Sequence, residues 1–101
     1  MLTAMLLFAA CANAEMPTAQ RQSELRNLVH QDCGSCHGMR LTGGLGPALT
    51  SQALGGKSPA FLHTAIREGR TGTPMPPWKN LLSASDIDWI VDYLKQDGAT
   101  P

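Results

Sequence analysis

The feature that most constrains this chain of 101 residues is the pentapeptide Cys33-Gly34-Ser35-Cys36-His37. Two cysteines three positions apart, with a histidine directly after the second, suit three chemistries: a zinc site, a dithiol for redox exchange, or covalent attachment of haem. In a helical segment, positions i and i+3 place both sulfur atoms toward one side of the same turn. The residues around the motif discriminate among the three.

Zinc is disfavoured because a structural site needs four protein ligands, and no second cysteine pair accompanies the motif. A thioredoxin-like dithiol is disfavoured because its motif follows a strand in a βαβ unit, whereas a helical pattern leads into Cys33. Covalent haem uses all three residues. Cys33 and Cys36 each form a thioether with one vinyl group, and the imidazole of His37 reaches the iron. The motif therefore predicts one covalently bound haem c.

The N-terminal residues are typical of an export signal. An apolar run over Leu2–Ala10 precedes the small-residue pattern Ala12-Asn13-Ala14, which predicts a signal peptide at residues 1–14, cleaved after Ala14. The run is too short to cross a bilayer, which takes about 20 apolar residues. The alternative is a lipoprotein signal in which Cys11 becomes the lipidated N-terminus. We expect the mature protein in the periplasm.

The remaining residues, 15–101, suffice for one small domain. A domain of this size has a marginal core and usually needs a disulfide, a metal or a cofactor. Lysine and arginine number 8 and are balanced by 8 aspartate and glutamate residues, so no basic excess indicates nucleic acid as a partner.

Apolar spacing predicts three helices, and no segment has the period-two alternation of a strand. The predicted helices are Ala19–Gln31, Pro59–Glu68 and Ala84–Gln96, with a short fourth near Ser51–Leu54. Two long loops connect them, Gly38–Thr50 and Gly69–Asn80, and loops of this length in a small domain usually have a function. The prediction is an all-α fold whose loops wrap the haem.

Capping residues mark the ends of two of these helices. Ser58 is an N-cap residue for the middle helix, and Gly69 is expected to end it. Ser83 and Asp86 form a capping box, with aspartate in place of glutamate, at the start of the last helix. Gly98 is expected to end that helix.

Met75 is the predicted second axial ligand of the iron. It lies between prolines in the segment Gly72–Trp78, where their fixed φ angles hold the backbone on both sides. A methionine that fills a core gap would normally lie on a helix stripe instead. The competing ligand, His63, is interpreted as a half-buried surface residue, and His30 as solvent-facing.

Cys33–His37, Gly46-Pro47 and Met75 ahead of a final amphipathic helix together resemble a class I c-type cytochrome. The resemblance covers about Ser23–Lys95. It implies the cytochrome c fold, with three to four helices around one haem, and a backbone carbonyl of Pro47 that orients the imidazole of His37.

The resemblance also implies that the first and last helices cross and pack together. The side chains expected at the crossing are Leu25, Leu28 and Val29 from the first helix and Ile90, Val91 and Leu94 from the last. The first helix departs from the family because it lacks the glycine and aromatic pair common there, so Val29 or Asn27 takes those places.

Two loop sequences narrow the resemblance: GGLGPAL at residues 43–49 and EGRTGTPMPPW at residues 68–78. They are similar to the small monohaem cytochromes found with cytochrome cd1 nitrite reductase in denitrifying bacteria. This implies a monomeric carrier of single electrons, with the reductase as partner and no enzymatic activity, since His37 and Met75 fill both axial positions. The alternatives are an accessory role in haem d1 biosynthesis or reductase maturation, and a haem sensor with a displaceable Met75.

The formal net charge of zero hides an uneven distribution. The basic residues outside the first and last helices are Arg40, Lys57, Arg67, Arg70 and Lys79, with Glu68 opposing them. The last helix and the residues after it carry Asp86, Asp88, Asp92 and Asp97 against Lys95. We predict that the basic loops surround the haem edge and meet an acidic patch on the partner; the alternative is that these charges only solvate the surface.

Overall fold

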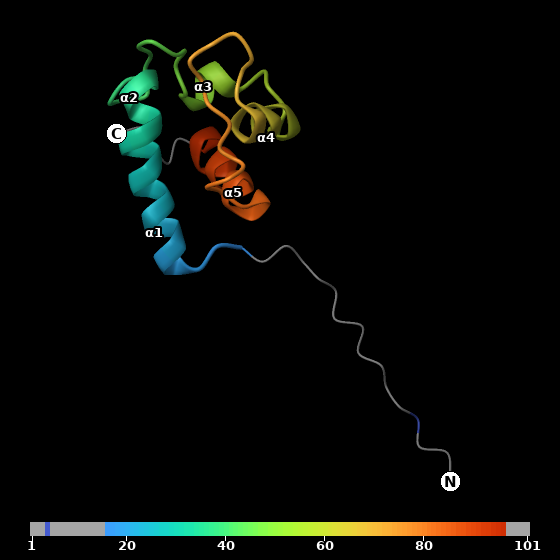
Figure 1. Ribbon diagram of the computed structural model, residues 1–101. Coiled ribbons are helices and arrows are strands. Elements are labelled where there is room, and N and C mark those ends of the chain that lie inside the picture. Colours follow the sequence, from blue (N-terminus) through green and yellow to red (C-terminus); the bar gives the residue numbers. More distant parts are fainter. Residues whose placement is uncertain (1–3, 5–15, 97–101) are drawn as a thin grey trace.

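The computed structural model describes Ala4 and residues 16–96, and all regular structure in this part of the chain is helical (Figure 1). The elements are α1 (Ala19–Leu28), η1 (Val29–Cys33), α2 (Gly34–His37), α3 (Ser51–Leu54), α4 (Pro59–Glu68) and α5 (Ala84–Lys95). This confirms the all-α prediction. The predicted cleavage site after Ala14, Cys11 and the helix stop at Gly98 lie outside the described residues. None of the described helices is long and apolar enough to span a membrane.

The first helical segment is longer than predicted. α1, η1 and α2 follow one another without a break from Ala19 to His37. η1 is a π-helical stretch, in which the N–H of Gly34 donates to the carbonyl of Val29 five residues earlier. A π turn is a local irregularity that is frequent at functional sites. The prediction ended too early because the apolar stripe stops at Val29, while the residues beyond it belong to the cysteine motif.

The predicted ranges of α3 and α4 are confirmed, and so is the capping box of α5. The N–H of Phe61 donates to Ser58 Oγ over 3.1 Å at the start of α4, and Gly69 ends this helix with φ 68°. At the start of α5, the N–H of Asp86 donates to Ser83 Oγ and the N–H of Ser83 donates to Asp86 Oδ2, each over 3.1 Å. These caps satisfy backbone donors that the helices leave free.

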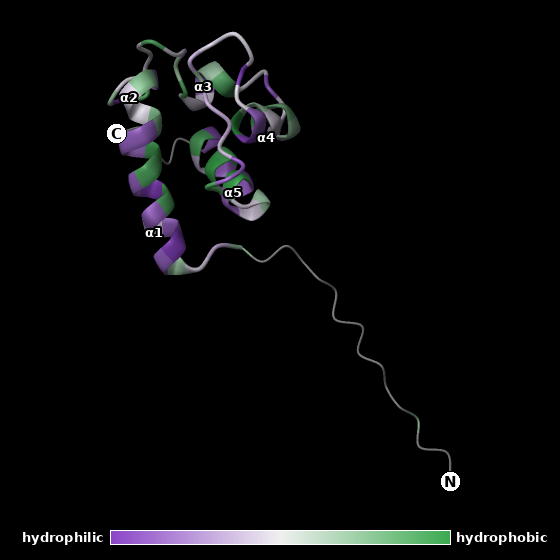
Figure 2. Ribbon diagram, viewed as in Figure 1, coloured by the Kyte–Doolittle hydropathy of each residue, from purple (hydrophilic) through white to green (hydrophobic). Residues whose placement is uncertain are grey.

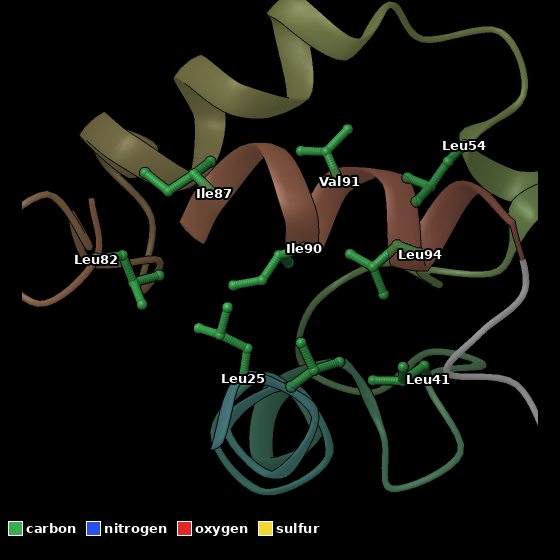
Figure 3. Close-up of a cluster of buried hydrophobic side chains, with 9 residues drawn as sticks. Leu25, Leu41, Leu54, Leu82, Ile87, Ile90, Val91 and Leu94 are labelled. Carbon is green, nitrogen blue, oxygen red and sulfur yellow. The ribbon is translucent and has the colours of Figure 1, made fainter. Parts of the chain in front are cut away.

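α5 is the central helix of the core, because it packs against both α1 and α4. Figure 3 shows Ile90 and Leu94 pointing toward α1, whereas Ile87 and Val91 point toward α4. Val91 was expected at the crossing with α1, and this expectation is wrong. Burying each such side chain stabilises the fold by about 1.5–3 kcal/mol.

Few side chains of the first helical segment are buried at its crossing with α5. Leu25 and Val29 are fully buried, whereas Leu28 is only half-buried and packs at the edge of the core. Figure 2 shows that α1 is largely hydrophilic, with a thin hydrophobic stripe. Such a pattern suits a helix that contacts the core along one side only. The resemblance left two candidates for the crossing position, Val29 and Asn27, and Val29 is the one that is buried there.

An ion pair joins the start of α1 to the start of α5. Nη2 of Arg21 lies 2.9 Å from Asp86 Oδ2, and Nε lies 3.3 Å from Asp86 Oδ1. The guanidinium, together with the backbone N–H of Ser83, lowers the pKa of the Asp86 carboxyl against the opposing effect of its burial. Asp86 therefore both caps α5 and pairs with Arg21 of α1.

His30 contributes a second polar contact between these helices. Its Nε2 lies 3.2 Å from the hydroxyl of Tyr93, and the ring of Tyr93 stacks on Trp89 with centroids 4.9 Å apart. The interpretation of His30 as solvent-facing is wrong, because its side chain is half-buried and contacts Tyr93 of α5.

Candidate functional site

Cys33, Cys36 and His37 lie within the last turns of the continuous helical segment. Cys33 ends η1, and Cys36 and His37 end α2. Both thiols are free and half-buried, while His37 is buried with 9% of its surface exposed. The helical conformation therefore brings the two thiols and the imidazole together at one end of the segment.

The environment of Cys33 differs from that of an exchange dithiol. Burial raises the pKa of the Cys33 thiol to about 11, and the negative charge of Asp32 acts in the same direction. Thiols that exchange electrons have a lowered pKa, because the thiolate is the nucleophile. No group of three or more His, Cys, Asp and Glu side chains able to hold a metal ion occurs in the described part of the chain. These observations favour the haem reading of the motif.

The imidazole of His37 is held by the loop that follows it. Nδ1 lies 2.7 Å from the backbone carbonyl oxygen of Pro47. A carbonyl can only accept, so Nδ1 carries the proton and donates, and the lone pair of Nε2 is left for a metal. The structure thus brings together the two residues that the resemblance paired.

This loop reaches His37 because it folds back onto the end of α2. The N–H of Gly43 donates to the carbonyl of His37 over 2.9 Å, and the N–H of Gly46 donates to the carbonyl of Cys36 over 2.8 Å. These bonds satisfy carbonyls that the end of a helix leaves free. Gly38 makes the reversal possible: its φ is 93°, and a Cβ there would lie 2.5 Å from the carbonyl oxygen of Gly43.

Gly46 lies directly against the imidazole ring. A Cβ at this position would be 2.7 Å from both Cε1 and Nδ1 of His37, closer than two atoms can approach. Sequence reasoning treated Gly46 only as part of a Gly-Pro motif and missed its packing role. The only signal was the glycine next to Pro47, because the contact partner is ten residues away along the chain.

Leu41 anchors the same loop in the core. It is fully buried, although its backbone has φ 59°, a left-handed conformation that costs a non-glycine residue about 1–2 kcal/mol. Burial of its side chain offsets a cost of this size. Sequence reasoning missed Leu41 as a core residue because it belongs to no helical stripe.

Met75 lies in the loop between α4 and α5, and its side chain is half-buried. The end of this loop is bonded to the last turn of α4. The N–H of Trp78 donates to the carbonyl of Ile66 over 3.1 Å, and the N–H of Lys79 donates to the carbonyl of Arg67 over 3.2 Å. In Figure 1 this loop and the loop after α2 cross the same end of the molecule. Cys33, Cys36, His37 and Pro47 thus form one connected group, and Met75 stands on a separate loop.

His63 is engaged elsewhere. Its Nδ1 lies 2.6 Å from Oδ1 of Asp88, so that it links α4 to α5. A histidine whose ring nitrogen is bonded to a carboxylate of a neighbouring helix has a structural role, which agrees with its interpretation as a half-buried surface residue.

The basic residues of the loops differ in their pairing. Arg67 and Lys79 both contact Glu68, and the guanidinium of Arg70 lies 5.7 Å from the ring centre of the exposed Phe61. No ion pair joins Arg40, Lys57 or Arg70 to a carboxylate within residues 16–96. Among the five basic residues between α2 and α5, these three are the ones whose positive charge no described carboxylate compensates.

The residues present fit a covalently bound haem. Two free thiols lie within one turn, the proximal imidazole has a fixed tautomer and a free Nε2, and a glycine-lined loop packs against the ring edge. Haem attachment would also supply the apolar mass that so small a core lacks.

Comparison with known proteins agrees with this chemistry. Residues 20–94 match the family described as cytochrome c oxidase, cbb3-type, subunit III. Cytochrome c55X of Pseudomonas aeruginosa is 56% identical over 87 residues, which cover 86% of this chain and 73% of that protein. The solved structure of the c-type cytochrome NirC superposes with a TM-score of 0.82 at 58% identity, covering 84% of this chain and all of the other.

A larger protein shares the same domain. Dihydro-heme d1 dehydrogenase of Pseudomonas aeruginosa is 36% identical over 69 residues, which cover 68% of this chain but only 14% of that enzyme. The structure of dihydro-heme d1 dehydrogenase NirN in complex with DHE superposes with a TM-score of 0.65 at 35% identity, over 74% of this chain and 16% of the other. The predicted fold, haem c and membership of the c-type cytochromes are confirmed: the chain belongs to this family of c-type cytochrome domains.

Proposed function

We propose that this chain is a carrier of single electrons whose haem is held by thioethers from Cys33 and Cys36 and by His37 and Met75 as the axial iron ligands. The observation that carries the proposal is the 2.7 Å contact between Nδ1 of His37 and the carbonyl oxygen of Pro47. It leaves Nε2 as the only ring nitrogen able to bind iron, and it fixes the ring plane.

The bound haem supplies a one-electron redox centre. The chain's own contribution would be to ligate the iron through His37 and Met75, which would leave no open position for a substrate. The loop after α2 holds the imidazole through Pro47, and the closed loop between α4 and α5 presents Met75. Because both ligands stay in place, little protein rearrangement accompanies electron transfer.

Export is part of the same proposal. Residues 1–14 would be a signal peptide removed after Ala14, and residues 15–101 the periplasmic cytochrome domain. The family match begins at residue 20, which supports a domain that starts after the apolar run. Lipidation at Cys11 is the alternative, and the mass of the mature N-terminal peptide distinguishes the two.

Cytochrome cd1 nitrite reductase is the proposed electron acceptor. The loops at residues 43–49 and 68–78 support this, since they are similar to the small cytochromes found with that enzyme. The uncompensated charges of Arg40, Lys57 and Arg70 suit a partner with an acidic docking patch. Attraction of this kind accelerates encounter and weakens with added salt.

The likeness to dihydro-heme d1 dehydrogenase favours a second candidate function. A dehydrogenation releases electrons, and a c-type cytochrome domain can accept them. This chain would then receive electrons during haem d1 biosynthesis, rather than deliver them to the mature reductase.

Stopped-flow mixing discriminates between these functions. The reduced, haem-loaded protein is mixed with cytochrome cd1 nitrite reductase, and the oxidised protein with dihydro-heme d1 dehydrogenase and its substrate. Fast, salt-sensitive oxidation by the reductase, with turnover when nitrite is added, supports the donor role. Reduction in the second mixture alone supports the biosynthetic role. Binding of carbon monoxide or nitric oxide to the native ferrous protein would instead indicate a sensor with a displaceable Met75.

A further inference from the structure

Both backbone polar groups of Met75 are held by other residues of its loop. Its N–H donates to Thr73 Oγ1 over 3.3 Å, and its carbonyl accepts from the N–H of Arg70 over 3.2 Å. Within residues 74–77 only Met75 has a backbone N–H, because the other three are prolines. The Thr73 hydroxyl therefore holds the single donor of this stretch.

The same hydroxyl is used a second time. Thr73 Oγ1 donates to the carbonyl of Arg70 over 2.7 Å, and this carbonyl also accepts from the N–H of Thr73 over 3.0 Å. Arg70 and Met75 are thus joined directly by their backbones and again through the Thr73 side chain. Three residues form a closed ring of hydrogen bonds around the turn.

The base of this turn is fixed on α4. A Cβ at Gly69, where φ is 68°, would lie 2.6 Å from the carbonyl oxygen of Met75, so the chain passes very close to the ligand residue. The guanidinium of Arg70 lies over the ring of Phe61 in α4. The N–H of Arg70 holds the carbonyl of Met75, and the Thr73 hydroxyl holds the backbone on the N-terminal side of Met75.

We propose that Thr73 is a positioning residue for Met75: its hydroxyl fixes the Met75 backbone so that the thioether is presented to the haem iron. The inference rests on the proposed ligation by Met75. A thioether is a weak axial ligand. The affinity of Met75 for the iron therefore depends on the conformational entropy that the loop loses when the bond forms, and this loss is small when the loop is already ordered. Thr73 supplies this preorganisation from a position that does not contact the iron.

The test is titration of the haem-loaded ferric protein with imidazole, which competes with Met75 for the iron. Thr73→Ala and Thr73→Val remove the hydroxyl, and Thr73→Ser keeps it. We expect imidazole to bind Thr73→Ala and Thr73→Val roughly threefold to tenfold more tightly than wild type. This range corresponds to the net free energy that one hydrogen bond contributes. Their reduction potentials should also fall, because methionine ligation raises the potential. Thr73→Ser should match wild type in both measurements.

Thr71→Ala is the matched control. Thr71 is an exposed threonine of the same loop, and its hydroxyl makes no hydrogen bond to the described residues. Equal imidazole affinities for Thr73→Ala and Thr71→Ala would overturn the positioning role, as would a loosened Thr73→Ser. Thr73 is exposed, so these variants leave the core unchanged, and the Ala–Ser pair at position 73 isolates the hydroxyl.

Met75→Ala separates this inference from the ligand assignment. If Met75→Ala binds imidazole with wild-type affinity, the ligation by Met75 itself is wrong. If Met75→Ala opens the iron to imidazole while Thr73→Ala does not differ from Thr71→Ala, the ligation stands and only the role of Thr73 fails.

Discussion

The carbonyl oxygen of Pro47 lies 2.7 Å from Nδ1 of His37, although the two residues are ten positions apart in the sequence. The contact exists because the intervening loop folds back on α2 and places Gly46 against the imidazole. The loop therefore selects the tautomer and the orientation of the histidine together.

Gly46→Ala should displace the imidazole. Its Cβ would lie 2.7 Å from Cε1 and Nδ1 of His37, and the ring cannot move away without lengthening its bond to Pro47. Overpacking of this kind costs about 1–3 kcal/mol. We expect the free energy of unfolding of the haem-loaded protein, measured with guanidinium chloride, to fall by this amount, and the reduction potential to change with it.

Gly56→Ala is the control for this substitution. A Cβ at Gly56 would meet nothing within 4 Å, and its φ lies outside the left-handed range. Its unfolding free energy and potential should match wild type. If Gly46→Ala matches it, the ring is not held by close packing.

Asp86→Asn should weaken the fold most at neutral pH. Asp86 both caps α5 and pairs with Arg21, and loss of the charged cap and its partner costs on the order of 1–2 kcal/mol. The Arg21 guanidinium lowers the pKa of this carboxyl in the folded state. Its contribution is therefore complete above the unfolded pKa of about 4 and is lost as the pH falls through the folded pKa.

Unfolding free energies measured across this acidic range check the sign. The difference between wild type and Asp86→Asn should be largest at neutral pH and shrink on acidification. Asp92→Asn is the comparison, since Asp92 is an exposed residue of the same helix and its side chain makes no ion pair within residues 16–96. A gap between wild type and Asp86→Asn that stays constant with pH would contradict the account.

Tyr93→Phe should loosen the crossing of α1 and α5 slightly. The change removes the 3.2 Å contact between the tyrosine hydroxyl and His30 Nε2 while keeping the ring stacked on Trp89. The net loss for one such hydrogen bond is about 1 kcal/mol, which thermal unfolding of the haem-loaded protein can resolve. A melting temperature equal to that of wild type would show that the contact adds nothing to stability.

Arg40→Gln should slow electron transfer to an acidic partner. Arg40 is exposed, follows the haem motif by three residues and makes no ion pair within the described chain. We expect a decrease of roughly twofold to fivefold in the bimolecular rate at low salt, vanishing at high salt. Arg26→Gln is the control, because Arg26 lies over the ring of Trp89 at the α1–α5 crossing. Equal rates for both variants would indicate that the basic loops do not steer docking.

The helices followed from the sequence wherever an apolar stripe coincided with a capping residue. Ser58 and Ser83 gave the starts of α4 and α5 because an N-cap is a local interaction. The π turn at Val29–Cys33 and the contact of His30 with Tyr93 were missed. The His30 contact joins residues 63 positions apart in the sequence, and the π turn has no signal in local helix propensity.

The same distinction between local signals and long-range contacts applies to the candidate site. Cys33, Cys36 and His37 could be found because the motif is contiguous. Met75 was predicted as a ligand because prolines surround it, and its ligation stays a prediction. The close approach of Gly46 to His37 and the hydrogen bond of Thr73 to Met75 were missed. Both contacts arise where the backbone folds back, onto the imidazole ring or onto Met75, and neither leaves a periodic pattern. Resemblance to a family supplied Pro47, which residue chemistry alone would not.

The central claim is that His37 and Met75 close both faces of the haem iron, and binding of carbon monoxide to the ferrous protein tests it most directly. Wild type and Met39→Ala, a change at an exposed methionine two residues after His37, should keep their ferrous absorption spectra when carbon monoxide is added. Met75→Ala should bind carbon monoxide rapidly. A Met75→Ala protein whose spectrum and resistance to carbon monoxide match wild type would show that another residue ligates the iron.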